Sequence, residues 1–271
     1  METPFDLNKT EKNTFPSLRQ AFGLLGILLL ISVIASIPLA FLQNKATPQT
    51  KSLLNVLGYC ISMGVLLIVA IRMRQSRHFL WRKIPWSLIG LVLPFVFSLS
   101  IIIEPVIDLI PMPDFVKELF SSLITNDGYA FFMAVIAAPL LEELIFRGVI
   151  LDGFLKRYSP AKAIIWSSVL FGIAHFNPWQ FIAAFAFGCV AGWLYWKTNS
   201  LIPGIVAHFF NNFCAFVMML FTGDSFSSTQ QLMGYGKMYY ILYGICLAVF
   251  AVTFMTIRNK LKLNILTEKI D

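Results

Sequence analysis

Long apolar stretches limit most strongly what this chain can fold into. A helix needs about 20 predominantly apolar residues to cross the hydrocarbon core of a bilayer. Eight stretches of the 271-residue chain reach or approach that length. We therefore expect an all-α, polytopic membrane protein with about eight transmembrane helices. The stretches cover residues 21–42, 53–71, 86–103, 129–147, 161–177, 179–196, 201–221 and 238–257.

The composition agrees with lipid as the main solvent of the chain. Hydrophobic residues make up 58% of the sequence and charged residues only 13%, about half the share that is usual in soluble domains. The net charge of +7 is explained by Lys and Arg in the loops, because no basic face lies on a soluble segment. The lipid bilayer is thus an expected partner, and nucleic acid is not.

Basic residues fall in alternate loops, which predicts an orientation. The connection 72–83 and the segment 156–162 are rich in Lys and Arg, whereas the 104–128 loop is mainly acidic. Positively charged loops stay in the cytosol, so we expect both termini there. The bare termini show no organelle address and favour a bacterial plasma membrane. An amphipathic stretch over residues 115–123 predicts a short helix on the outer interface.

The pattern divides the chain into three parts. Residues 1–128 are expected to form an N-terminal region of three transmembrane helices with an outer loop. Residues 129–221 are expected to form the helical core that carries the candidate site. Residues 222–271 are expected to form a C-terminal transmembrane helix and a cytosolic tail.

Polar and ionisable residues inside three of the apolar stretches mark the candidate site. An ionisable residue at membrane depth costs about 2.5–3.5 kcal/mol on insertion scales, so a cluster of them indicates a function. The residues are Glu142, Glu143 and Arg147 in the fourth stretch, His175 in the fifth, and His208 and Asn212 in the seventh.

Helix geometry predicts how these side chains meet. Glu143 and Arg147 are four residues apart and can pair on one face of a helix. Glu142 points about 100° away from Glu143 and can face a cavity. His208 and Asn212 are also four residues apart and project toward one point. A glutamate, a histidine and a His/Asn pair from three helices would then surround one water molecule.

The candidate residues can meet only if they lie at the same depth in the membrane. Glu142 and His175 are almost equally far in sequence from the turn at Ser159, so an antiparallel hairpin places them at one level. His208 reaches that level if the polar 148–160 connection extends about 12 Å further into the cytosol, at the usual helical rise. The site is then expected in the cytosolic half of the membrane.

The three motifs Glu-Glu-x-x-x-Arg, Phe-x-x-x-His and His-x-x-x-Asn, in this order, resemble those of the CAAX-protease and bacteriocin-processing family (CPBP, also called Abi). The resemblance covers about residues 129–220. It implies an intramembrane endopeptidase, a hydrolase that cleaves peptide or membrane-protein substrates. It also implies an active site built from Glu142, Glu143, Arg147, His175, His208 and Asn212.

The residue types suit that chemistry. Glu142 is expected to act as the general base toward water, and His208 and Asn212 to donate hydrogen bonds to the oxyanion. The family is often described as metalloproteases, in which case Glu142, His175 and His208 would bind a divalent metal such as zinc. A His-Glu-x-x-His pair is absent and asparagine is a poor zinc ligand, so the interpretation leans only slightly toward a metalloprotease, and activation of water without a metal stays open as the alternative.

Two other functions compete with the protease. The same cavity would serve a non-catalytic membrane scaffold or a bacteriocin self-immunity protein that binds a partner. A proton-coupled transporter would relay protons through buried carboxylates, but it predicts an internal repeat that the sequence lacks. Each cluster taken alone also has a structural interpretation, because a Glu-Arg pair can clamp a helix and an asparagine can join helices. The sequence specifies neither a cleavage preference nor an oligomeric state.

Overall fold

The computed structural model describes residues 14–43, 46–116, 127–222, 229–234 and 236–267. In these ranges the regular structure is helical, and the only β feature is an isolated bridge between Trp81 and Ser200. The all-α prediction is confirmed. The outer helix expected over residues 115–123 falls mostly outside the described residues.

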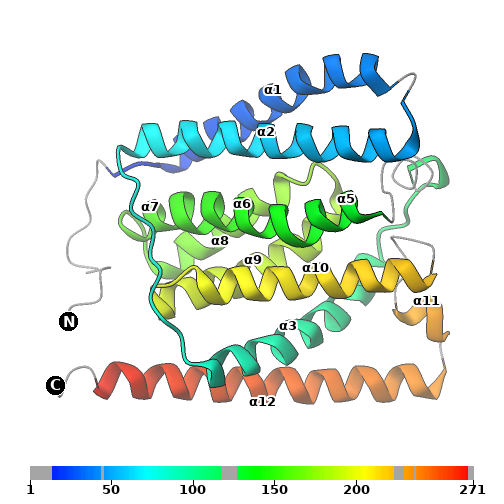
Figure 1. Cartoon of the computed structure of the whole chain (residues 1–271). Coiled ribbons are helices and arrows are strands. Elements are labelled where there is room, and N and C mark those ends of the chain that lie inside the picture. Colours follow the sequence, from blue (N-terminus) through cyan, green and yellow to red (C-terminus); the bar gives the residue numbers. More distant parts are fainter. Residues whose placement is uncertain (1–13, 44–45, 117–126, 223–228, 235, 268–271) are drawn as a thin grey trace.

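Seven of the described helices are long and apolar enough to cross a membrane, which confirms a polytopic membrane protein (Figure 1). The fifth predicted segment, 161–177, corresponds to a shorter helix, α8 (Pro160–Ile173). A short helix, α11 (Thr229–Met233), precedes the last long one. The seven are α1 (Leu18–Gln43), α2 (Pro48–Arg74), α3 (Trp86–Ile107), a composite helix Gly128–Leu155, α9 (Pro178–Thr198), α10 (Ile202–Thr222) and α12 (Lys237–Thr267).

Helix α8 has 14 residues and is therefore about 21 Å long at 1.5 Å per residue, less than the roughly 30 Å of the hydrocarbon core. The predicted segment continued to residue 177, but the helix ends at Ile173 and His175 lies in the turn that follows. Asn177 then caps α9, where its side chain accepts a hydrogen bond of 2.8 Å from Gln180 N. Pro178 occupies the first turn, as the sequence indicates.

The chain runs back and forth through the seven long helices and the shorter α8, so the start of α1 and the end of α12 lie at the same end of the bundle (Figure 1). The connections that follow α2, α7 and α9 lie at this end too. Hydrogen bonds join two of them: Leu201 N donates to Leu80 O at 2.9 Å, and Ser200 Oγ donates to Arg82 O at 2.7 Å. The basic connections of the sequence therefore gather at one end.

One hydrophobic cluster holds the bundle together and draws side chains from α1, α2, α3, α8, α9, α10 and α12. All residues from 146 to 155 are buried within it. The first half of the 148–160 connection thus lies inside the core instead of extending into solvent as a polar hairpin. Its acid, Asp152, accepts hydrogen bonds from Tyr195 Oη at 3.1 Å and from Lys156 Nζ at 2.8 Å, which offsets its burial.

The composite helix contains two π-helical turns, one on each side of the α6 segment. In the first turn, Ala138 N donates to Met133 O, five residues earlier. The same pattern would require residue 139 to donate to Ala134 O, but Pro139 has no N–H. Asn212 Nδ2 donates to this carbonyl instead, at 2.8 Å. A neighbouring helix therefore satisfies the carbonyl that the proline frees. The segments are α5 (Gly128–Phe131), η1 (Phe132–Ala137), α6 (Ala138–Ile145), η2 (Phe146–Leu151) and α7 (Asp152–Leu155).

The second π-helical turn, η2, is supported in the same way. Asp152 N donates to Arg147 O, five residues earlier. Ser167 Oγ of α8 donates to Phe146 O at 3.1 Å, and Arg74 Nη1 of α2 donates to Gly148 O at 2.5 Å. Side chains from three neighbouring helices thus hold the composite helix in place. Single π-helical turns are frequent at functional sites, and α6 between them carries Glu142 and Glu143.

Candidate active site

Helix α6 presents two adjacent carboxylates in opposite environments. Glu143 is fully buried, with 0% of its surface exposed. Its Oε1 atom accepts a hydrogen bond of 2.8 Å from Arg147 Nη1 and lies 3.1 Å from His208 Nδ1. The pair predicted from the four-residue spacing is therefore present, and a histidine from α10 completes it.

Aromatic rings surround the buried guanidinium of Arg147. Its Cζ atom lies 4.5 Å from the ring centroid of Phe171 and 5.7 Å from that of Phe187. Aromatic faces attract a cation, and the attraction is stronger where water is excluded. The Phe187 ring also lies 4.8 Å from the imidazole of His208. Phe171 belongs to the Phe-x-x-x-His motif, whereas Phe187 belongs to none of the three motifs.

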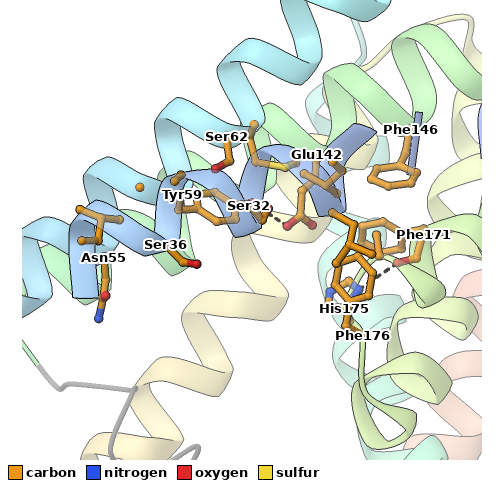
Figure 2. Close-up of a pocket in the computed structure, with 17 residues that line it drawn as sticks. Ser32, Ser36, Asn55, Tyr59, Ser62, Glu142, Phe146, Phe171, His175 and Phe176 are labelled. Atoms are coloured by element: carbon orange, nitrogen blue, oxygen red, sulfur yellow. Dashed lines mark hydrogen bonds between the residues drawn. The ribbon is translucent and has the colours of Figure 1, made fainter. Parts of the chain in front are cut away.

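Glu142 is less buried and contacts two other helices. Its Oε1 atom accepts a hydrogen bond of 2.7 Å from the Tyr59 hydroxyl of α2 (Figure 2). Its Oε2 atom lies 3.8 Å from His208 Nε2. His208 is thus placed between the two glutamates, with one ring nitrogen toward each. Because a carboxylate only accepts, Nδ1 of His208 carries the hydrogen that bonds Glu143.

His175 has a defined tautomer for the same reason. Its Nδ1 atom lies 2.9 Å from Phe171 O. A carbonyl oxygen only accepts, so Nδ1 carries the hydrogen and Nε2 of the neutral ring keeps its lone pair. The ring stands edge-on to Phe171, with 5.1 Å between centroids. His175 can therefore accept a hydrogen bond through Nε2.

Two cavities meet at Glu142, Phe171 and His175. The first has a volume of about 440 Å³ and a mostly apolar surface, and most of its lining residues lie on α1 and α2, among them several Ser together with Asn55 and Tyr59. Figure 2 shows Glu142 and His175 at one end of it and Asn55 at the other. The second has a volume of about 420 Å³ and reaches toward α3, α9 and α10, where His208 and Asn212 line it.

Asn212 is held by hydrogen bonds on both sides of its amide. Its Nδ2 atom donates to Ala134 O in η1, as described above, and its Oδ1 atom accepts from Asn211 Nδ2 at 3.3 Å. Asn211 in turn accepts a bond of 2.7 Å from Ser100 Oγ of α3. Asn212 therefore has two roles. It caps a carbonyl of the π-helical turn, and it lines the second cavity beside His208.

The predicted residues come together in two groups. Glu142, Glu143, Arg147 and His208 are joined by direct contacts, while His175 and Asn212 join them as walls of the second cavity. The sequence reasoning missed the partners Tyr59, Ser100 and Asn211. A signal for Tyr59 existed, because a tyrosine hydroxyl inside an apolar stretch usually has a hydrogen-bond partner when buried.

The candidate metal ligands are Glu142, His175 and His208. Across the part of the chain that the structure describes, no three His, Cys, Asp or Glu side chains form a group that could hold a metal. His208 directs Nδ1 to Glu143, and His175 directs Nδ1 to a backbone carbonyl. These contacts leave Nε2 of each ring free, as in histidines that bind a metal. It is therefore the spacing of Glu142, His175 and His208, and not their hydrogen bonding, that does not fit a zinc site in the described residues.

Comparisons with known proteins point to peptidases. Residues 125–214 match the model of a family described as Type II CAAX prenyl endopeptidase Rce1-like. Over 85 residues the chain is 33% identical to "Putative membrane peptidase YdiL" of Bacillus subtilis (strain 168), a match that covers 31% of this chain and 35% of that relative. No solved structure matches.

The matched segment contains all six predicted site residues. The resemblance drawn from the three motifs is therefore confirmed for this part of the chain, which matches the Rce1-like CAAX endopeptidase model. The chain spans about a third of the length of the curated relative that it matches. Helices α1, α2, α3 and α12 lie outside the matched segment.

Proposed function

We propose that the protein is an intramembrane endopeptidase of the CAAX-endopeptidase type that hydrolyses peptide bonds in peptide or membrane-protein substrates. The observation that carries the proposal is the position of Glu142. It lies where the two cavities meet, beside His208 and next to the buried Glu143–Arg147 pair. An ionisable side chain that is not needed for that pair is thereby available for chemistry.

Water activation follows from the hydrogen-bonding roles of two residues. The ionised Glu142 and Nε2 of neutral His175 both accept hydrogen bonds, and both residues line the two cavities. A water molecule between them donates one hydrogen to each and directs its lone pair at the scissile carbonyl. Glu142 takes a proton as the water oxygen bonds to the carbonyl carbon.

The tetrahedral intermediate then needs donors for its oxyanion. His208 and Asn212 line the second cavity and are the proposed donors. Since Nδ1 of His208 already donates to Glu143, Nε2 donates to the oxyanion only when the ring is doubly protonated. The intermediate collapses when the C–N bond breaks, and protonated Glu142 returns its proton to the leaving amine.

The two cavities suggest how a substrate lies in the membrane. The apolar cavity between α1 and α2 suits an apolar part of the substrate. The second cavity contains amide side chains, among them Gln180, Asn211 and Asn212, and suits the polar backbone around the scissile bond. We place the protein in the plasma membrane of a bacterium, with the basic end of the bundle and both termini in the cytosol.

The test is cleavage of a fluorogenic peptide panel, with prenylated and leader-type peptides, by detergent-purified wild type and by Glu142→Gln and His175→Ala. Loss of a general base lowers the rate by about 10²- to 10⁴-fold, and we expect Glu142→Gln to fall in that range. A chelator arm measures whether a metal contributes. Equal cleavage by folded wild type and folded Glu142→Gln would contradict the proposal and favour the scaffold or immunity function.

A further inference from the structure

We propose that Tyr59 is a positioning residue for Glu142, which holds the carboxylate in one orientation while it accepts and releases the proton. This inference rests on the proposed function, because it assigns Tyr59 a part in the same reaction. Tyr59 lies on α2, outside residues 125–214 that match the family.

The contact is a short hydrogen bond between a neutral donor and a carboxylate. The Tyr59 hydroxyl donates to Glu142 Oε1 at 2.7 Å, a length that is usual for an O–H donor to an ionised acceptor. The other oxygen of Glu142 lies 3.8 Å from His208 Nε2, beyond hydrogen-bond distance. Tyr59 is thus the side chain that fixes the carboxylate directly.

Glu142 needs a partner that holds its carboxylate in one orientation. A glutamate side chain has three rotatable bonds, and its freedom costs free energy when the reaction requires one orientation. Glu143 on the same helix is fixed by Arg147 and His208. Glu142 points toward the cavities and receives no comparable ion pair at hydrogen-bond distance. The phenol supplies orientation without adding a charge to the site.

The hydrogen bond also suits both states of the base. When Glu142 is ionised, Oε1 accepts from the phenol as a carboxylate oxygen. When Oε2 has taken the proton from water, Oε1 still accepts as the carbonyl oxygen of the neutral acid. The bond therefore persists through the proton transfer, and the site needs no rearrangement at that moment.

The local packing keeps Tyr59 in place. At the preceding residue, Gly58, an added Cβ would lie 2.5 Å from Leu39 Cδ1, so glycine allows α1 to approach α2 closely here. The ring of Tyr59 lines the first cavity between these helices (Figure 2). A helix outside the matched segment therefore supplies a group that acts on the base.

The experiment compares Tyr59→Phe with wild type, Glu142→Gln and Tyr158→Phe. Tyr59→Phe keeps the ring and removes only the hydroxyl. We expect kcat to fall about 10- to 100-fold, the scale of a hydrogen bond to a charged group, while KM changes less than about threefold. Tyr158 is the matched control, because its hydroxyl accepts from Leu18 N at 3.3 Å outside the site, and its kcat should stay within about twofold of wild type.

Rates are normalised to the folded fraction in thermal unfolding, so that lost stability is not counted as lost catalysis. A second readout is the infrared carboxylate band of Glu142, identified by its loss in Glu142→Gln, which should shift in Tyr59→Phe. Wild-type kcat in Tyr59→Phe, a higher KM with unchanged kcat, or an unshifted band would overturn the inference while Glu142→Gln still supports the protease. No cleavage by wild type would overturn both.

Discussion

Glu143 and Glu142 are neighbours in the sequence, yet they belong to two different halves of the site. In the closed half, Glu143, Arg147 and His208 are between 0% and 5% exposed and bond to one another. In the open half, Glu142 and His175 line two cavities, and Glu142 is held by a neutral tyrosine. The comparison teaches that burial of a carboxylate does not by itself make it reactive.

The physical difference lies in how each charge is compensated. Burying an ion pair costs several kcal/mol of desolvation per ion, and good geometry with further hydrogen bonds is needed to offset it. The closed half supplies part of this compensation: Arg147 and His208 both contact Glu143 Oε1, and two aromatic rings lie beside the guanidinium. Glu143 Oε2 and two guanidinium nitrogens are buried without a hydrogen-bond partner among the described residues. The open half leaves its carboxylate with one firm hydrogen bond and access to space. The closed half therefore mainly stabilises the site and holds His208 at the second cavity, whereas the open half contains the proposed general base.

The largest effect is expected when the closed half loses its cation. Arg147→Met keeps much of the side-chain volume but leaves Glu143 buried without its guanidinium. Breaking a buried pair in this way costs about 3–5 kcal/mol, so the free energy of unfolding in detergent should fall by that amount. Reversible chemical unfolding of wild type and variant measures it.

The matched control is the other acid–base pair on the same composite helix. Lys156 pairs with Asp152 at 2.8 Å with the same four-residue spacing, but the lysine side chain is 39% exposed. The Asp152 side chain is only 11% exposed, but in Lys156→Met it keeps the hydrogen bond from Tyr195, so the free energy of unfolding should fall by less than in Arg147→Met. Similar losses in Arg147→Met and Lys156→Met would remove the distinction between a closed half and ordinary helix pairs.

Two side chains that cap the π-helical turns, Asn212 and Ser167, are expected to contribute similarly to stability but differently to kcat. Asn212→Ala and Ser167→Ala each remove a donor to a backbone carbonyl, so each should lower the unfolding free energy by about 1–3 kcal/mol. Asn212 also lines the second cavity, and loss of one oxyanion donor lowers kcat about 10²- to 10³-fold. Ser167 is buried in the core, and its variant should keep kcat within about threefold of wild type.

The measurements are kcat at saturating peptide and chemical unfolding for both variants. A normal kcat in Asn212→Ala would assign Asn212 to the support of the helix alone. An equal loss of kcat in Ser167→Ala would mean that the π-helical turns, rather than the cavity, set the rate.

An effect on stability without a loss of kcat is expected at Gly204 of α10, which faces the closed half. A Cβ on this residue would lie 2.9 Å from Glu143 Oε2. Since Arg147 and His208 already fix Glu143, the carboxylate cannot move away freely, and Gly204→Ala should cost about 1–3 kcal/mol, as overpacked cores do. Gly26 of α1 has no atom within 4 Å of an added Cβ, so Gly26→Ala should not destabilise the protein. A neutral Gly204→Ala would mean that the closed half has more room than its contacts indicate.

Much of the fold was predictable because apolar length and loop charge are local properties. Seven of the eight apolar stretches appear as helices long enough to cross a membrane, and Pro178 begins α9, a position that proline favours. The helix at 160–173 is shorter than its apolar stretch, because Asn177 and Pro178 start the next helix and the chain must turn before them. The burial of residues 146–155 was not predictable, since it depends on the partners that Tyr195 and Lys156 provide for Asp152.

Within the site, the sequence by itself determined the pairing of Glu143 with Arg147, because a spacing of four residues places both on one face of a helix. It also determined that Glu142 points elsewhere. Only the tertiary structure decided that His208 lies between the two glutamates, that Asn212 caps the carbonyl freed by Pro139, and that Tyr59 holds Glu142. The reason is physical: contacts within one helix follow from its periodicity, whereas contacts between helices depend on their rotation and depth in the bundle, which the packing of the whole chain sets.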